Sequence, residues 1–225
     1  GGTRAPLRIG ALSTLSRNFQ MRFLEPLLQS GCSDVILKSG SEAVLMEALT
    51  DLTLDVVLST EPPRGSSRTV FVAQKIAEQP VGLYGTSSRV QADSLMALLS
   101  EQPLILPTES ALRTGFEGLV ARLGITPRVA FDVDDMAMVR LLARAGAGLA
   151  IVPSVVVQDE LAAGLLMPAP FSLDIMESFY AVTIHRSFPH PLLARLMAPE
   201  TEIVAHGLAE PRQASQPDQT APRRD

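Results

Sequence analysis

Cysteine and aromatic residues are scarce in this chain of 225 residues. Cys32 is the single cysteine, so no disulfide can form within the chain, and the sequence gives no support to an oxidised, secreted scaffold. No hydrophobic run is long enough to cross a bilayer, and the N-terminus has no signal-peptide core. We therefore expect a protein of the cytoplasm with no membrane partner.

An excess of basic charge is also missing, since the formal net charge is −5. A chain that binds nucleic acid by itself would normally present a basic face, so this acidic balance argues against direct binding. The content of 46% hydrophobic and 19% charged residues is typical of a globular protein with a core. The length allows one large domain or two small lobes.

Catalytic and cofactor motifs are absent as well. The three histidines, His185, His190 and His206, have no spacing that suits a metal site or a catalytic triad. The glycines of "SGSEAV" and "RAGAGLA" lack the Rossmann and P-loop spacings, and Gly146 and Gly148 more simply end a helix and admit a close turn. We expect no enzyme activity, no catalytic residue, no metal and no cofactor.

Alternating strands and helices are what the sequence does contain. The first half predicts strands and helices, in chain order, at 7–12, 15–29, 34–38, 41–50 and 54–59. Extended segments at 69–75 and 80–85 and a helix near 91–100 follow. The same βαβαβ order then recurs, at an offset of about 95 residues, over 104–107, 110–123, 128–133, 134–145 and 148–154. The remaining predicted elements are a helix at 154–163, extended segments at 165–170 and 178–185, and a helix at 190–198.

Two βαβαβ units with right-handed crossovers predict an α/β fold of two doubly wound, Rossmann-like lobes. The extended segments at 80–85 and 178–185 are placed to cross between the lobes as hinge strands. The predicted division is lobe I over 7–83 plus 184–205, lobe II over 84–183, and a disordered tail over 207–225.

Hydroxyl-bearing and acidic residues follow nearly every predicted strand. Ligands of open α/β sheets bind beyond the carboxyl ends of the strands, where helix N-termini present free N–H groups. Each such residue can also be a helix cap or a turn residue, but their repetition favours a small-molecule site between the lobes. The candidate effector-binding residues are Ser13, Thr14, Ser16, Ser39, Ser41, Thr60, Thr108, Ser110, Asp134 and Pro153.

Several segments in order carry a resemblance to a known family: "LRIGALSTL", "SEAVLMEALTDLTLDVVLS", "LILPTES" and "MVRLLARAGAGLAIVPS". Over roughly residues 7–200, the chain resembles the effector-binding domain of LysR-type transcriptional regulators. "FDVDDMAMVRLLARAGAGLAIVPS" is most similar to the regulators of the sodium/proton antiporter, a weaker match. Thr53-Leu54, where the family commonly has glycine, and the hydroxyl-rich first loop depart from the family pattern.

The resemblance implies a fold like that of type II periplasmic binding proteins and a role as the sensor of a DNA-binding regulator. Contact with DNA would come only through an N-terminal helix-turn-helix domain, which this sequence does not include. The alternative is a free-standing solute-binding protein for a small anionic metabolite. The residues upstream of Gly1 would distinguish the two.

The chemistry of the ligand and the assembly are further expectations. Arg17 and Arg113 could bind a carboxylate, whereas Asp132, Asp134 and Asp135 could sense a cation, and the sequence does not decide between them. Helix 15–29 has apolar residues on two sides, with Met21, Leu24 and Leu28 on the second. We expect a homodimer, as the resemblance also implies, in which helix 15–29 of one chain packs on helix 110–123 of the other. The full-length protein is expected to form a higher oligomer.

Overall fold

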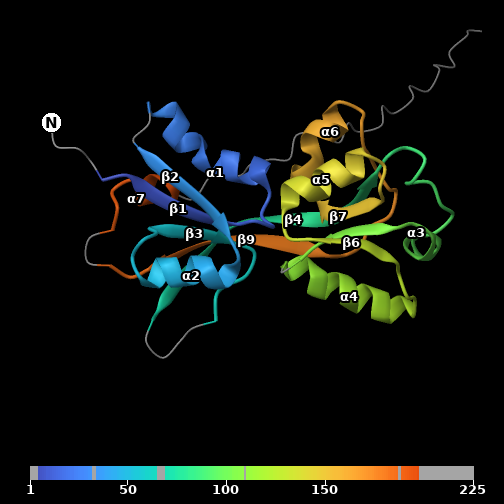
Figure 1. Ribbon diagram of the computed structural model, residues 1–225, viewed down its shortest axis with the longest axis horizontal. Coiled ribbons are helices and arrows are strands. Elements are labelled where there is room, and N and C mark those ends of the chain that lie inside the picture. The colour runs from blue at the N-terminus through green and yellow to red at the C-terminus, as the bar shows by residue number, and fades with distance from the viewer. Residues whose placement is uncertain (1–4, 32–33, 65–68, 109, 187–188, 198–225) are drawn as a thin grey trace, which may run out of the picture.

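The computed structural model describes residues 5–31, 34–64, 69–108, 110–186 and 189–197, with strands flanked by helices (Figure 1). The predicted α/β fold class is confirmed. The first half has the expected order: β1 (Leu7–Leu12), α1 (Arg17–Gln29), β2 (Val35–Gly40), α2 (Glu42–Thr50) and β3 (Val56–Ser59). Strand β1 pairs in parallel with both β2 and β3.

The second half has the same order. After α3 (Leu95–Glu101) come β5 (Leu104–Pro107), α4 (Ala111–Leu123), β6 (Val129–Val133), α5 (Met136–Arg144) and β7 (Leu149–Pro153). Strand β5 lies between β6 and β7 and is parallel to both, as β1 is to its neighbours. Helix α4 ends at Gly124, whose φ of +63° is the left-handed conformation that favours glycine at a helix end.

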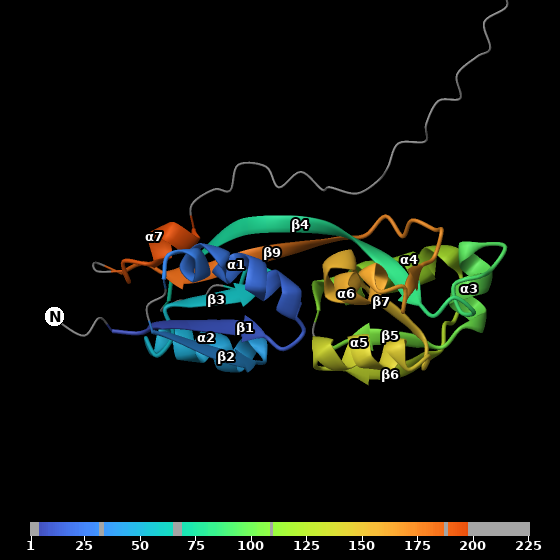
Figure 2. The same cartoon turned by 90° about the horizontal axis from the view of Figure 1, so that it is seen from above.

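Two long antiparallel strands join the halves, as Figure 2 shows from above. Strand β4 (Phe71–Gly85) and strand β9 (Met176–Ile184) pair along most of their length. Strand β9 also pairs with β3, while the end of β4 pairs with β7 and with the short β8 (Met167–Pro168). A hydrogen-bonded path therefore runs through the described strands in the order β2-β1-β3-β9-β4-β7-β5-β6.

Several predicted elements differ from the structure. The segments expected at 69–75 and 80–85 are one strand, because Pro80 lies where β4 leaves β9 and the N–H of the next residue, Val81, donates to the Ile175 carbonyl at 2.8 Å. The helix expected at 154–163 is a 3₁₀ turn, η1 (Ser154–Val157), followed by α6 (Gln158–Ala162). The last helix is only α7 (Leu193–Leu196). The predicted tail and Cys32 lie outside the described residues.

The buried core is shared between the halves on the side of α1. One apolar cluster includes Phe19 of α1 together with Val139 of α5 and Val156 of η1. A second surrounds β5 and α4 and includes Leu112 and Phe116. Because the first cluster contains residues of both halves, it does not test the predicted lobe boundaries, which stay a prediction.

Polar contacts join the halves on the same side. The Asn18 amide donates to the Val155 carbonyl at 3.0 Å, and the Arg22 guanidinium donates to the Gln158 side chain at 2.7 Å. The backbone N–H of Met136 also donates to the Ser13 carbonyl at 2.9 Å. On this side, α1 is thus fixed to η1, α6 and the start of α5.

Candidate functional site

A cavity of about 680 Å³ lies between the two halves, on the side of α2 and α4. The first turns of α2 and α4 form two of its walls, and the loop after β3 with the start of β4 forms another. Its lining residues are Ser41, Glu42, Ala43, Met46, Glu61, Pro62, Pro63, Arg64, Phe71, Ser110, Arg113, Thr114 and Glu117. The volume suits a small metabolite.

The N-termini of α2 and α4 differ from those of α1, α3 and α5. Ser16, Ser94 and Asp135 cap α1, α3 and α5 by accepting backbone N–H groups of the first turn. Ser41 and Ser110 occupy the same position before α2 and α4, but neither side chain makes that bond. The first N–H groups of both helices are therefore left without a side-chain cap at the edge of the cavity, in the arrangement that favours an anion.

Both positively and negatively charged side chains line the cavity. The Arg113 guanidinium, from α4, donates to the Asp132 carboxylate at 2.8 Å and lies 3.6 Å from Glu117. The hydrogen bond from Arg113, with that from Thr108, holds the pKa of Asp132 below its usual range. Arg64 adds a second cation, while Glu42 and Glu61 add carboxylates. Arg113 is therefore held in place by neighbours before any ligand binds.

Of the ten predicted site residues, the structure brings Ser41 and Ser110 to this cavity. Ser16 is buried and caps α1 through the N–H of Phe19. The exposed hydroxyl of Ser39 accepts a bond of 3.3 Å from Arg17. Thr108 donates to the carboxylate of Asp132.

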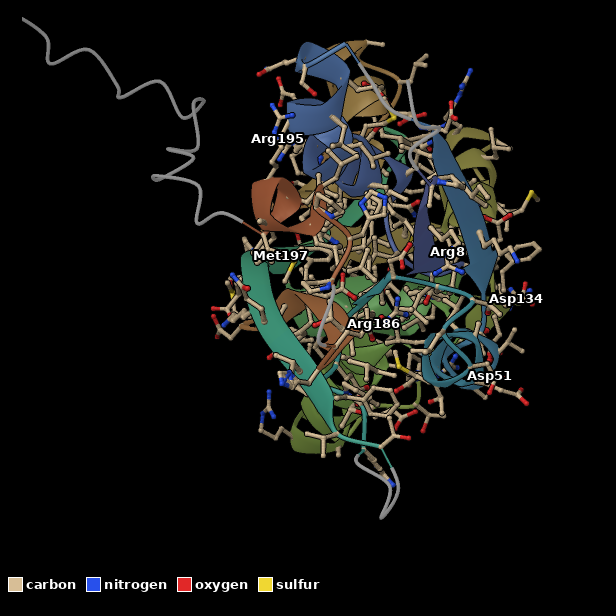
Figure 3. All side chains as sticks on the ribbon, turned by 90° about the vertical axis from the view of Figure 1, so that its left-hand side faces the viewer. Arg8, Asp51, Asp134, Arg186, Arg195 and Met197 are labelled. Carbon is tan, nitrogen blue, oxygen red and sulfur yellow. The ribbon has the colours of Figure 1, made fainter. Side chains whose placement is uncertain are left out.

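The other predicted site residues lie outside the cavity lining. Ser13 links β2 to α5 through its own N–H and carbonyl, which contact Gly40 and Met136. Thr14 and Thr60 are buried, and Pro153 is a buried residue of β7 that pairs with Val81. Asp134 is exposed and lies at the margin of the molecule in Figure 3. For all ten, a role in binding stays a prediction.

The acidic residues at the start of α5 do not converge on one point. Asp132 is bound to Arg113, and Asp135 caps α5 and lies 3.9 Å from Arg17. Asp134 has no part in these contacts, and within the described ranges no group of three acidic, histidine or cysteine side chains could hold a metal. The structure therefore gives no geometric support to cation sensing by this cluster.

One residue that the sequence did not single out stands beside the site. Glu177 of β9 is a carboxylate in a strand, 1% exposed, and its Oε1 accepts a hydrogen bond of 2.9 Å from Ser110. The sequence shows only a charged residue next to a run of strand formers, a pattern that a solvent-facing position would also give.

No helix among the described residues is long and apolar enough to span a membrane.

Solved structures of low sequence identity share this architecture. The CcmR regulatory domain of Synechocystis PCC6803, in complex with 2-PG, gives a TM-score of 0.66 at 18% identity, over 86% of this chain and 96% of that one. The apo-form HypT regulatory domain of Salmonella typhimurium gives 0.64 at 15% identity, over 84% and 90%. The CrgA regulatory domain of Neisseria meningitidis gives 0.61 at 18%, over 80% and 89%. The fold is that of the regulatory domains of LysR-type transcriptional regulators.

The family is established at the level of sequence. The model of the LysR substrate binding domain matches residues 1–198, and the chain belongs to that family. No curated protein matches the chain in a direct comparison of sequences. The chain is thus an effector-binding regulatory domain of a class of transcription regulators that are not enzymes, which favours the predicted sensor over the free-standing solute-binding protein.

Proposed function

We propose that the cavity between α2 and α4 is the effector site and that it binds a small carboxylate or another small anion. One observation carries the proposal: two helices, α2 and α4, open on the same cavity without a side-chain cap. Partial positive charge from both helix ends and the Arg113 guanidinium favour an anion there and disfavour a cation. The Ser41 hydroxyl can add a further contact, whereas that of Ser110 already donates to Glu177.

The carboxylates of the cavity limit the charge of the ligand. Glu117 stays close to Arg113, and Glu42 and Glu61 face the same space. A compact monoanion or dianion fits this balance, whereas a highly charged polyanion would meet three carboxylates. The more specific likeness to antiporter regulators, and a cation as effector, stay predictions without structural support.

Arg113→Gln should weaken the binding of a small dicarboxylate such as oxalate by about tenfold or more, because a charge-assisted hydrogen bond contributes roughly 1.5–3 kcal/mol. Isothermal titration calorimetry measures the affinity. Arg122→Gln is the matched control, since Arg122 lies in the last turn of the same helix, outside the cavity. Equal affinity of both variants and the wild type would contradict the site, and so would no binding of oxalate to the wild type.

We further propose that the domain forms a two-fold dimer through α1 and β2 of one chain and α5 and β6 of the other. Strands β2 and β6 stand at the two ends of the strand order, so each has an edge without a partner strand in the described chain. Large apolar side chains are exposed on all four elements: Met21, Leu28, Ile36, Leu37, Val129, Phe131, Met138 and Leu141. Helices α1 and α5 lie on the same side of the molecule (Figures 1 and 2).

This surface revises the partner expected for α1. The apolar residues of α4 face its own core, since Leu112, Phe116 and Leu119 are buried there. Leu24, assigned in the sequence to the second stripe of α1, is also buried within the chain. An apolar contact for α1 is thus better supplied by α5, where Met138 and Leu141 are 43% and 45% exposed.

Leu141→Glu should weaken dimerisation by at least about tenfold, because a carboxylate would be buried in an apolar interface. Light scattering across a micromolar concentration series measures the change. Val44→Glu on α2 is the control, since Val44 is also an exposed apolar residue but lies outside the four elements. If Ala121→Glu on α4 dissociates the dimer and Leu141→Glu does not, the pairing of α1 with α4 is correct instead.

The cytoplasm remains the proposed compartment, because a transcription regulator must reach DNA. Regulators of this family bind small-molecule effectors, form oligomers and bind DNA. For this chain, contact with DNA through a separate helix-turn-helix domain and assembly beyond the dimer are proposals that follow from family membership.

A further inference from the structure

Glu177 lies beside Ser110 of the cavity lining, on β9, the strand that passes from one half of the molecule to the other. It pairs with Gln79 of β4, and residues directly opposite in an antiparallel pair project from the same face of the sheet. The side chain is 1% exposed, yet Ser110, its hydrogen-bond partner, lines the cavity. A single hydroxyl therefore separates this carboxyl group from the effector site.

The surroundings of Glu177 suit a neutral carboxyl group. Oε1 of Gln79 is buried and accepts no hydrogen bond from the described residues, so it is an acceptor without a donor. A protonated Glu177 would offer an O–H on the same face, while its other oxygen still accepts from Ser110. Burial, which the Ser110 hydrogen bond offsets only in part, raises the pKa of Glu177 to about 7.

Charged groups on the neighbouring elements do not neutralise Glu177. On β4, Lys75 is paired with Glu78, and on α4, Arg113 is bound to Asp132 and Glu117. Helix α2 contributes the carboxylates Glu42 and Glu47, β3 carries no charged residue, and on β9 Tyr180 is the remaining titratable group. Glu177 has no ion pair with any described residue.

We propose that effector binding is linked to the proton: an anion enters the cavity together with one proton, which Glu177 takes up. An ionised Glu177 places a negative charge one hydroxyl away from the anion, whereas a protonated Glu177 does not. By linkage, the anion then favours protonation of Glu177 to the same extent that protonation favours the anion. The inference rests on the proposed anion site and adds to it a dependence on pH near neutrality.

Oxalate is a suitable probe, because both of its carboxylates stay ionised across the relevant range. We expect the wild-type chain to bind oxalate about tenfold more tightly at about pH 6 than at about pH 8.5. Glu177→Gln keeps the shape of the protonated acid, with an oxygen that can accept from Ser110 and an N–H donor in place of the O–H. At both pH values the variant should bind oxalate as tightly as the wild type does at the lower pH. At the higher pH it should therefore bind more tightly than the wild type, and misfolding cannot produce such a gain.

Glu78→Gln is the matched control, because Glu78 neighbours Glu177 across the same strand pair but is exposed and bound to Lys75 and Ser178. It should keep the wild-type dependence on pH. Carboxyl carbon NMR on the wild type gives a readout that needs no variant: one glutamate should titrate near neutrality, and oxalate should move that titration to higher pH.

Binding of oxalate with equal affinity at both pH values would overturn the proton linkage and leave the anion site standing. A dependence on pH that survives in Glu177→Gln, or a Glu177 resonance that titrates at the ordinary pKa of a glutamate, would also overturn it. No binding of oxalate at either pH would overturn the anion site and the linkage together.

Discussion

Asp55→Ala should lower the free energy of unfolding by about 3 kcal/mol, because removal of one member of a buried ionic cluster leaves its partners uncompensated. The Asp55 carboxylate accepts bonds of 2.9 and 3.2 Å from the Arg8 guanidinium and 3.0 Å from that of Arg186. The backbone N–H of Arg8 also donates to it at 2.8 Å. Figure 3 looks onto this end of the molecule and labels both arginines.

The magnitude lies at the lower end of the range for buried pairs for a structural reason. The Asp55 side chain is 4% exposed, but those of Arg8 and Arg186 are 32% and 20% exposed, so water can solvate both guanidinium groups after the change. Urea unfolding measures the loss. Glu25→Ala on the exposed face of α1 is the control and should leave stability within about 0.5 kcal/mol.

The same cluster gives the chain a dependence on acid. Burial opposes ionisation of Asp55, but hydrogen bonds from Arg8 and the charges of Arg8 and Arg186 together hold the pKa of this carboxyl below its ordinary value. Its contribution is therefore present above the ordinary pKa of an aspartate and is lost as pH falls through the folded value. Asp55→Asn should lose less stability than the wild type over that acidic range. Parallel slopes would show that other carboxyl groups cause the acid sensitivity.

Gly148→Ala should cost about 3 kcal/mol or more, since insertion into a packed site forces the backbone to move. A Cβ at Gly148 would lie 2.4 Å from the carbonyl oxygen of Pro103, and that oxygen accepts the N–H of Leu149 at 2.9 Å where β7 begins beside β5. The clash is with backbone, so no rotation of a side chain relieves it. Urea unfolding with the variant and the wild type side by side measures the loss.

Gly118→Ala on α4 is the matched control. Its added methyl group would lie 3.5 Å from the flexible end of Arg122 and should stabilise the helix by about 0.5–1 kcal/mol. Equal midpoints for the two variants would contradict the close approach at Gly148.

The glycine-rich segment 146–148 was identified from the sequence as a turn, and Gly146 with a φ of +75° ends α5 as expected.

The order of elements was predictable because it depends on local patterns. Apolar periodicity and the recurrence of βαβαβ place β1–β3 and β5–β7 within a few residues. The single strand β4 was not predictable in this way, because Pro80 interrupts its pattern. The strand tolerates this proline because its pairing partner changes from β9 to β7 at that point. Pairing between residues a hundred positions apart leaves no local mark.

The sequence predicted where in the fold the site lies, but not which residues line it. Sequence reasoning placed hydroxyl residues at strand ends, yet it could not tell Ser16, which caps its own helix, from Ser41, which does not. Each is a serine directly before a helix, so the local pattern is the same for both. Glu177 was missed because burial of a carboxyl group is decided by β4 and α4, which pack over it from elsewhere in the chain.

The position of β9 limits when the N-terminal half can be completed as the chain leaves the ribosome. Strands β1, β2 and β3 can pair with one another within residues 7–59, and β5, β6, β7 and the end of β4 within residues 81–153. Strand β3 and the first part of β4 must wait for β9, which ends at Ile184. The half that is synthesised first is thus completed last, and its β3 edge stays open to other chains until the final segment emerges.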